Sequence, residues 1–282
     1  MLNCTKCYET RRKKVKDREM PAMSNDPNKA YYEMAGVPER YTLRTSLFAS
    51  EEAILASIQE ELRGKAILDI GVGAGRTTAH LMAISKEYVG IDYSEKMIRL
   101  CGERFADATL MVCDARDMSV FDCEQFAAAF YCYNGIDEVS PADRILILKE
   151  VNRVLKKGGI FVFSSHNLDW EAAPFYSFSG FSFSPDPIRL IRDNTNRLRA
   201  FASGLITRIR NKSSTSGYAV VMEHETLKGM VLPTYYISKE AQVRQLLDVG
   251  FCQVVALDSR GLVIDSQKSV SDAWLNYVAR KG

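Results

Sequence analysis

Three aspartates follow three successive apolar stretches and could bind one ligand together. Asp69 ends "AILD", Asp92 ends "YVGID" and Asp114 ends "TLMVCD". If these stretches are parallel strands, their carboxyl ends share the edge of the sheet at which open α/β folds bind ligands. A carboxylate after the second strand can accept both ribose hydroxyl hydrogens, and one after the third can accept from an adenine amino group. The three positions therefore predict an adenosine-containing ligand.

The loop after Asp69 is rich in glycine but does not match the dinucleotide-binding fingerprint. Gly71, Gly73 and Gly75 give G-x-G-x-G, and Arg76 occupies the position at which that fingerprint has its third glycine. Asp69 would also repel a pyrophosphate, whereas it would attract an ammonium or a sulfonium group. The loop therefore disfavours a nicotinamide oxidoreductase and favours a cationic amino-acid nucleoside.

Elements that could position these groups alternate along the chain. Five strand-like stretches between residue 64 and residue 166 are separated by helical patterns, which indicates βαβ units with right-handed crossovers and a parallel sheet. An amphipathic helix is expected over 50–62, before the first strand. A capped helix at 238–251 and two strands, "CQVVALD" and "AWLNYVAR", are expected to complete the sheet.

The composition shifts along the chain predict four parts. Residues 1–28 are a mobile basic arm, 29–63 an N-terminal helical cap, and 64–166 with 238–282 the ligand-binding core. Residues 167–237 break the alternation and are expected to form an inserted lid or substrate-binding subdomain. Its aromatic side chains either cover an apolar acceptor or fill the core of the subdomain.

The overall composition narrows the class of protein. The 282 residues carry 37 Lys and Arg against 35 Asp and Glu, a balance that does not favour nucleic acid as the partner. No apolar run is long enough to span a bilayer, and seven scattered cysteines favour a reducing compartment, so a cytoplasmic protein without membrane contact is expected. Cys4 and Cys7 form a CxxC without a second pair, and no metal site is expected.

Five ordered segments resemble class I S-adenosylmethionine-dependent methyltransferases of the small-molecule type: "LDIGVGAGR", "GIDYSEKMI", "CDARDM", "YCYNGIDEV" and "EVNRVLKKGGIFVFSSHN". The resemblance implies an α/β fold with a Rossmann-like, doubly wound, seven-stranded, mostly parallel sheet. Its final strand would be antiparallel, and the inserted lid would lie between strands 5 and 6. The implied cofactor is S-adenosyl-L-methionine. The resemblance assigns its binding to Asp69, Gly71, Gly73, Gly75, Arg76, Asp92, Tyr93, Met97, Asp114, Ala115, Tyr131 and Asn134.

Catalytic candidates follow from the chemistry of methyl transfer. A hydroxyl acceptor benefits from a general base, and His166 lies just past the fifth strand and titrates near neutral pH. His166 could instead only cap the strand end. Asn134 and Asp137 could orient the acceptor, while Tyr31, Tyr32 and Tyr41 could close the cofactor site. The candidate substrate-binding residues are Tyr31, Trp170, Phe175, Tyr176, Phe178 and His224.

The sequence therefore predicts methyl transfer to a small molecule, with a hydroxyl acceptor favoured and an amine possible, in natural-product or sugar or lipid biosynthesis. The protein is expected to be a monomer or a homodimer. Two alternatives stay open: an RNA or protein methyltransferase, suggested by the basic stretch at 189–210, and a non-catalytic scaffold that binds the cofactor.

Overall fold

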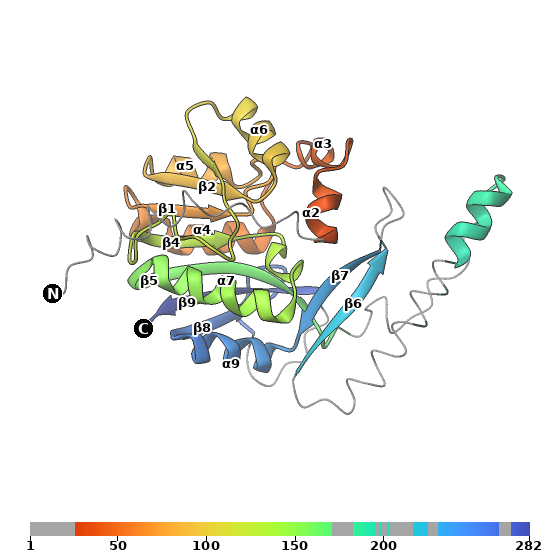
Figure 1. Ribbon diagram of the computed structural model, residues 1–282. Helices are drawn as coiled ribbons and strands as arrows, with labels where there is room; N and C mark the ends of the chain where they lie inside the picture. Colours follow the sequence, from red (N-terminus) through yellow and green to blue (C-terminus); the bar gives the residue numbers. More distant parts are fainter. Residues whose placement is uncertain are drawn as a thin grey trace, which may run out of the picture.

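The computed structural model describes residues 26–170, 183–195, 198, 202, 217–224, 231–264 and 272–282. The strands form one mixed sheet, with parallel and antiparallel pairs, and helices cover both of its faces (Figure 1). The helices are α2 (Pro27–Tyr32), α3 (Pro38–Tyr41), α4 (Ala49–Leu62), α5 (Thr78–Ile84), α6 (Glu95–Arg104), α7 (Pro141–Val154) and α9 (Lys239–Val249), with a short 3₁₀ helix η1 (Gly135–Asp137). Within these described ranges, no helix is both long and apolar enough to cross a membrane.

The central strands run parallel, as the alternating sequence predicts. They are β1 (Ile67–Ile70), β2 (Tyr88–Asp92), β3 (Thr109–Val112), β4 (Phe126–Tyr131) and β5 (Leu155–Asn167), in the spatial order β3-β2-β1-β4-β5. The last strand, β9 (Trp274–Lys281), lies antiparallel to β5 and also pairs with β8 (Phe251–Leu257). The predicted Rossmann-like sheet with an antiparallel final strand is confirmed.

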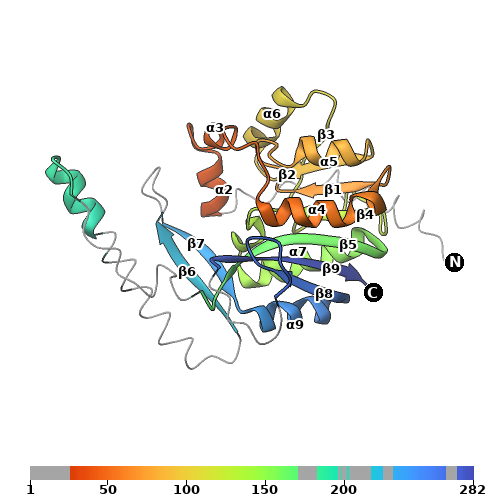
Figure 2. The ribbon, with the colours of Figure 1, turned by 180° about the vertical axis from the view of Figure 1, so that it is seen from behind.

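Alternate residues of each strand pack into two separate cores. Leu68, Phe161 and Phe163 face a cluster that includes the buried side of α7, whereas Ile67 and Val162 face a second cluster with the buried side of α4. Successive strand side chains point to opposite faces, so a strand that is buried on both sides is apolar throughout. Figure 1 shows α7 on the near face of the sheet, and Figure 2 shows α4 on the opposite face.

Two strands of the inserted segment join this same sheet. The strand β6 (Tyr218–His224) forms an antiparallel hairpin pair with β7 (Val231–Ile237), and β7 pairs in parallel with the last residues of β5, His166 and Asn167. The sheet thus has nine strands in the described part of the chain, against the seven expected. The difference arises because β5 continues past the end of β4. The strand β4 pairs with β5 only as far as Phe163, and β7 pairs with the free edge of His166 and Asn167 beyond it.

The N-terminal cap is held over the carboxyl edge of the sheet by side-chain hydrogen bonds. Asp26 caps α2 by accepting from the backbone N–H groups of Asn28 and Lys29. The buried Asn28 amide donates to the carbonyl oxygens of Glu138, at 2.6 Å, and Pro233, at 3.3 Å. These bonds join α2 to the segment after η1 and to β7, so the cap, the sheet edge and the hairpin meet at one place.

Candidate active site

A cleft lies at the carboxyl ends of β1, β2 and β4. It contains about 1060 Å³ of space outside the protein atoms, including the part that is open to solvent. Ten of the twelve residues expected to bind a cofactor line it: Asp69, Gly71, Gly73, Arg76, Asp92, Tyr93, Met97, Asp114, Ala115 and Tyr131. Gly75 and Asn134 do not line the cleft. The edge of the sheet therefore brings together residues that are up to 62 positions apart.

Asp69 is a buried carboxylate at the end of β1. Its Oδ2 atom accepts hydrogen bonds from the Thr77 hydroxyl, at 2.7 Å, and from the Tyr88 hydroxyl, at 2.9 Å. Burial opposes ionisation more than these bonds favour it, and the pKa of Asp69 rises to about 6. A cationic ligand group in the cleft would offset the cost of this buried negative charge.

Asp92 ends β2 and holds the glycine-rich loop in place. Its two carboxylate oxygens accept from the backbone N–H groups of Gly73 and Ser94, each at 2.9 Å. Burial again raises the pKa, to about 6. Each carboxylate oxygen has two lone pairs, so both keep acceptor capacity for a pair of ligand hydroxyl groups.

Asp114 differs from the other two aspartates because it already has a cationic partner. Arg116 donates to both of its oxygens, and its closest contact to Oδ2 is 2.6 Å. Burial opposes ionisation of Asp114, but the Arg116 hydrogen bonds and charge outweigh it, so the pKa is lowered. A ligand amino group would have to share the carboxylate with Arg116.

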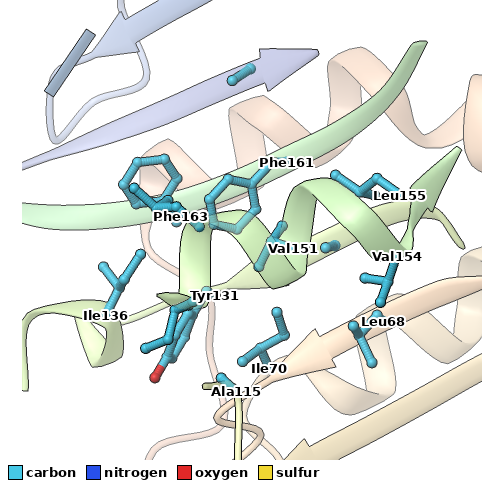
Figure 3. Packing of buried hydrophobic residues seen from close by; sticks show 14 of the residues in the cluster. Leu68, Ile70, Ala115, Tyr131, Ile136, Val151, Val154, Leu155, Phe161 and Phe163 are labelled. Atoms are coloured by element: carbon cyan, nitrogen blue, oxygen red, sulfur yellow. The ribbon is translucent and has the colours of Figure 1, made fainter. Parts of the chain in front are cut away.

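Tyr131 fills the space between the two glycine-containing turns of the site. A Cβ atom on Gly71 would lie 2.8 Å from the Tyr131 ring, and one on Gly135 would lie 2.5 Å from it. Only glycine allows the ring this close approach. In Figure 3, Tyr131 lies beside Ile70 and Ala115, at the cleft end of the apolar core.

Two other loop residues have packing roles. Gly75 has a positive φ of 87°, and a Cβ there would meet Phe105 at 2.6 Å and Cys101 at 2.9 Å, so this glycine allows contact with α6. Arg76 lines the cleft, but its guanidinium makes a bidentate ion pair with Glu51 of α4. Both residues thus have contacts within the protein, and their predicted ligand contacts stay a prediction.

Arg44 is a cleft residue that the sequence analysis missed. Its guanidinium donates to the Tyr133 hydroxyl and lies over the Tyr133 ring, 5.1 Å from the centroid. Within the described ranges no carboxylate pairs with Arg44, in contrast to Arg76 and Arg116. It could bind the carboxylate of an amino-acid ligand. No motif surrounds Arg44 that could have singled it out.

The aromatic residues of the cap divide between the core and the cleft. Tyr32 and Tyr41 line the cleft, and the Tyr32 hydroxyl donates to Glu138 at 2.5 Å. Tyr31, a predicted substrate-binding residue, is only 2% exposed and packs with Val37 and Leu232 instead. Adjacent residues of a helix point in different directions, so Tyr32 lines the cleft and Tyr31 does not.

The catalytic candidates lie next to the cleft. His166 Nδ1 lies 2.8 Å from the Asp137 carboxylate, and His166 Nε2 lies 3.4 Å from the Asn134 side-chain nitrogen. Asn134 and the preceding Tyr133 both have left-handed backbones, with φ of 60° and 61°. Such conformations cost about 1–3 kcal/mol each for residues other than glycine and are frequent at functional sites.

The remaining predicted substrate residues are placed only in part. Trp170 packs with Leu168 against the β6–β7 hairpin and does not line the cleft. Phe175, Tyr176 and Phe178 lie outside the described residues, as does the Cys4–Cys7 pair. His224 ends β6, where its backbone pairs with Val231, and its side chain is outside the description.

Comparisons with known proteins agree with this geometry. The model of a methyltransferase domain family matches residues 67–159, the segment from β1 into β5. Residues 67–159 thus match a methyltransferase domain, and the fold is that of S-adenosylmethionine-dependent methyltransferases of known structure. The match covers the strand-end aspartates, the glycine-rich loop and Asn134, but it stops before His166.

Individual relatives match the methyltransferase domain and its fold. The protein YqeM of Bacillus subtilis (strain 168) is 29% identical over 142 residues, covering 49% of this chain and 56% of YqeM. The demethylmenaquinone methyltransferase of Staphylococcus carnosus (strain TM300) is 32% identical over 115 residues, covering 39% of this chain and 46% of that enzyme. The chain thus spans about half the length of these curated relatives. An S-adenosylmethionine-dependent methyltransferase from Clostridium acetobutylicum has the same fold, with a TM-score of 0.59 at 14% identity over 90% of this chain and 99% of that one.

Proposed function

We propose that the protein is a cytoplasmic S-adenosylmethionine-dependent methyltransferase that acts, as a monomer or homodimer, on a small-molecule acceptor. A hydroxyl group is the favoured acceptor, with an amine as the second possibility, in natural-product or sugar or lipid biosynthesis. The demethylmenaquinone methyltransferase among its relatives acts, by its name, on a small molecule. The methyl donor supplies an activated methyl group, so the residues of the chain have to orient the acceptor and exclude water.

The observation that carries the proposal is the set of buried, energetically costly carboxylates in one cleft. Asp69 and Asp92 are 1% and 6% exposed, and burial raises the pKa of each to about 6. A ligand with a cationic amino-acid end and two ribose hydroxyls would give both carboxylates partners. Arg44, on the cap side of the same cleft, would bind the carboxylate of such a ligand.

Ligand binding tests the donor site first. Calorimetric titration with S-adenosylhomocysteine should show one site on the wild-type protein, and Asp92→Ala should abolish it. Asp117→Ala is a matched control, because Asp117 is exposed and lies outside the cleft. Binding that survives Asp92→Ala would refute the ribose assignment, and binding of NADH in place of S-adenosylhomocysteine would refute the proposed donor.

Transfer of a labelled methyl group tests the acceptor class. The protein should transfer label from S-adenosylmethionine to components of a small-molecule extract, and not to total RNA or to a peptide mixture. Label in the RNA or peptide fraction would replace the small-molecule proposal. Donor binding without any transfer would favour the scaffold alternative.

A further inference from the structure

A histidine–carboxylate pair lies beside the cleft, at the junction of β4, β5 and the β6–β7 hairpin. A single oxygen of Asp137, Oδ2, contacts both His166 Nδ1, at 2.8 Å, and the His166 backbone nitrogen, at 2.6 Å. Because Asp137 is an acceptor, His166 Nδ1 carries the hydrogen in this contact and Nε2 keeps its lone pair. The pair therefore holds the imidazole ring in one tautomer and one orientation.

A buried arginine fixes the other oxygen of Asp137. Arg144 is completely buried, and its guanidinium pairs with Asp137 Oδ1 and donates to the Ile136 carbonyl oxygen and to Ser165 Oγ, at 3.0 and 3.1 Å. Its remaining N–H groups donate to Gln242 and Gln245 of α9. The Asp137 carboxylate thus cannot rotate without breaking its contacts to α7 and β5.

The charges around the ring keep it basic. Burial lowers the pKa of His166, but the hydrogen bond and charge of Asp137, with smaller effects of Glu223 on β6 and Glu138 after η1, raise it above its ordinary value. Tyr236 on β7 packs against the ring at 4.9 Å between centroids, and its hydroxyl donates to Glu223. Arg144 pairs with the same Asp137 carboxylate, so the negative charge that faces the ring is shared with a buried guanidinium.

Asn134 separates the Nε2 side of the His166 ring from the residues that line the cleft. His166 is 22% exposed, and its Nε2 has only a long contact of 3.4 Å with the Asn134 amide nitrogen. Asn134 stands between the cleft-lining residues Tyr133 and Gly135, and its own buried Oδ1 has no hydrogen-bond partner among the described residues. An acceptor hydroxyl that displaced the Asn134 amide would donate its single hydrogen to Nε2.

We propose that His166 is the general base of methyl transfer and that Asp137 and Arg144 are its positioning residues. A general base at this place implies that the acceptors are small molecules with a hydroxyl group. This proposal rests on the proposed function. The acceptor O–H bond breaks and its proton moves to His166 Nε2. The acceptor oxygen forms a bond to the transferred methyl carbon, while the carbon–sulfur bond of the donor breaks and its electron pair stays on sulfur. Asp137 stabilises the imidazolium, which then releases the proton to water.

Nitrogen NMR of the protein without ligand tests the positioning part independently of activity. The chain has three histidines, so His166→Gln identifies the relevant signals. Neutral His166 should carry its proton on Nδ1, and Asp137→Asn should lower its pKa by about one pH unit and populate the other tautomer. If Asp137→Asn does not fold, the double variant Asp137→Asn/Arg144→Gln removes both buried charges. A neutral ring protonated on Nε2 in the wild type would overturn the proposal.

Label transfer into the small-molecule extract tests the catalytic part. His166→Gln should lower the initial rate at pH 7.5 by about 100-fold or more, with S-adenosylhomocysteine binding unchanged. The wild-type rate should fall on the acid side at the NMR-measured pKa, and this dependence should vanish in His166→Gln. His80→Gln, an exposed change on α5, is the control. A His166→Gln rate equal to that of the wild type would refute the role of His166 as general base. If the wild-type protein does not bind S-adenosylhomocysteine, the proposed function is refuted instead.

Discussion

Ionisation of the buried Asp92 carboxylate lowers the stability of the free protein, so the stability of Asp92→Asn relative to the wild type should increase as pH rises. Burial raises the pKa of Asp92 from 3.8 to about 6. A folded-state pKa above the unfolded one means that the native state binds the proton more tightly. This contribution to stability is fully present below about pH 3.8 and is lost as pH rises through about 6. The rise in the pKa of Asp92 corresponds to about 3 kcal/mol in the free energy of unfolding, since one pKa unit is about 1.4 kcal/mol.

The asparagine variant has no proton to lose, and the comparison with wild type isolates this group. The free energy of unfolding of Asp92→Asn minus that of the wild type should increase by about 2–3 kcal/mol between pH 4 and pH 8. Urea unfolding at several pH values, without ligand, measures this difference, and the contributions of all other groups cancel in it.

Asp114→Asn provides a control of opposite sign. The pKa of Asp114 is lowered, so its contribution to stability is present above its unfolded-state pKa and is lost as pH falls through the folded-state pKa. The variant should therefore be less stable than wild type at neutral pH and approach it in acid. A difference for Asp92→Asn that stays flat from pH 4 to pH 8 would show that burial of this carboxylate is not costly, and would remove the main argument for a ligand partner.

Three further outcomes are expected. Gly71→Ala should weaken S-adenosylhomocysteine binding in calorimetry, because the added methyl group displaces the tyrosine ring 2.8 Å away, whereas Gly36→Ala, at a similar positive φ in open space, should not. Arg44→Ala should weaken binding of S-adenosylhomocysteine by about tenfold but leave 5′-methylthioadenosine, which lacks the amino-acid end, unaffected; equal losses would refute the carboxylate contact. Arg144→Met should lower the free energy of unfolding by about 3–5 kcal/mol, since it leaves a buried carboxylate unpaired, and a smaller loss in urea unfolding would contradict that pairing.

The aspartates and glycines of the proposed donor site were predictable because they follow local rules. Asp69, Asp92 and Asp114 each end an apolar stretch, and the parallel order of β1, β2 and β3 places strand ends at one edge. The glycines of the loop after β1 lie next to this edge by chain connectivity alone. The positions of the strands, and the edge of the sheet at which they end, could therefore be predicted from the alternation of apolar and polar stretches, without knowledge of distant contacts.

The ion pairs within this part of the site were not predictable, because several side chains, some from other elements, compete for each charged group. Arg76 follows the loop in sequence, but Glu51 on α4 binds its guanidinium. Asp114 takes Arg116, two residues away, as its partner, although other carboxylates also lie near that arginine. Several carboxylates compete for each cation, and the sequence does not show which is within 3 Å.

The acceptor half depends still more on long-range contacts. Arg144 contacts Gln242 and Gln245, which are 98 and 101 positions away. His166 contacts Tyr236 only because β7 pairs with the end of β5. The strand pair that brings this hairpin to the site consists of two residue pairs, too short a signal to recognise in sequence. Residues 67–159 match the family model, whereas His166 and the hairpin lie beyond it. The three aspartates of the proposed donor site thus lie in the shared segment, and the histidine proposed to act on the acceptor lies in the segment that follows, where the buried Arg144 network couples α7 and α9 to it.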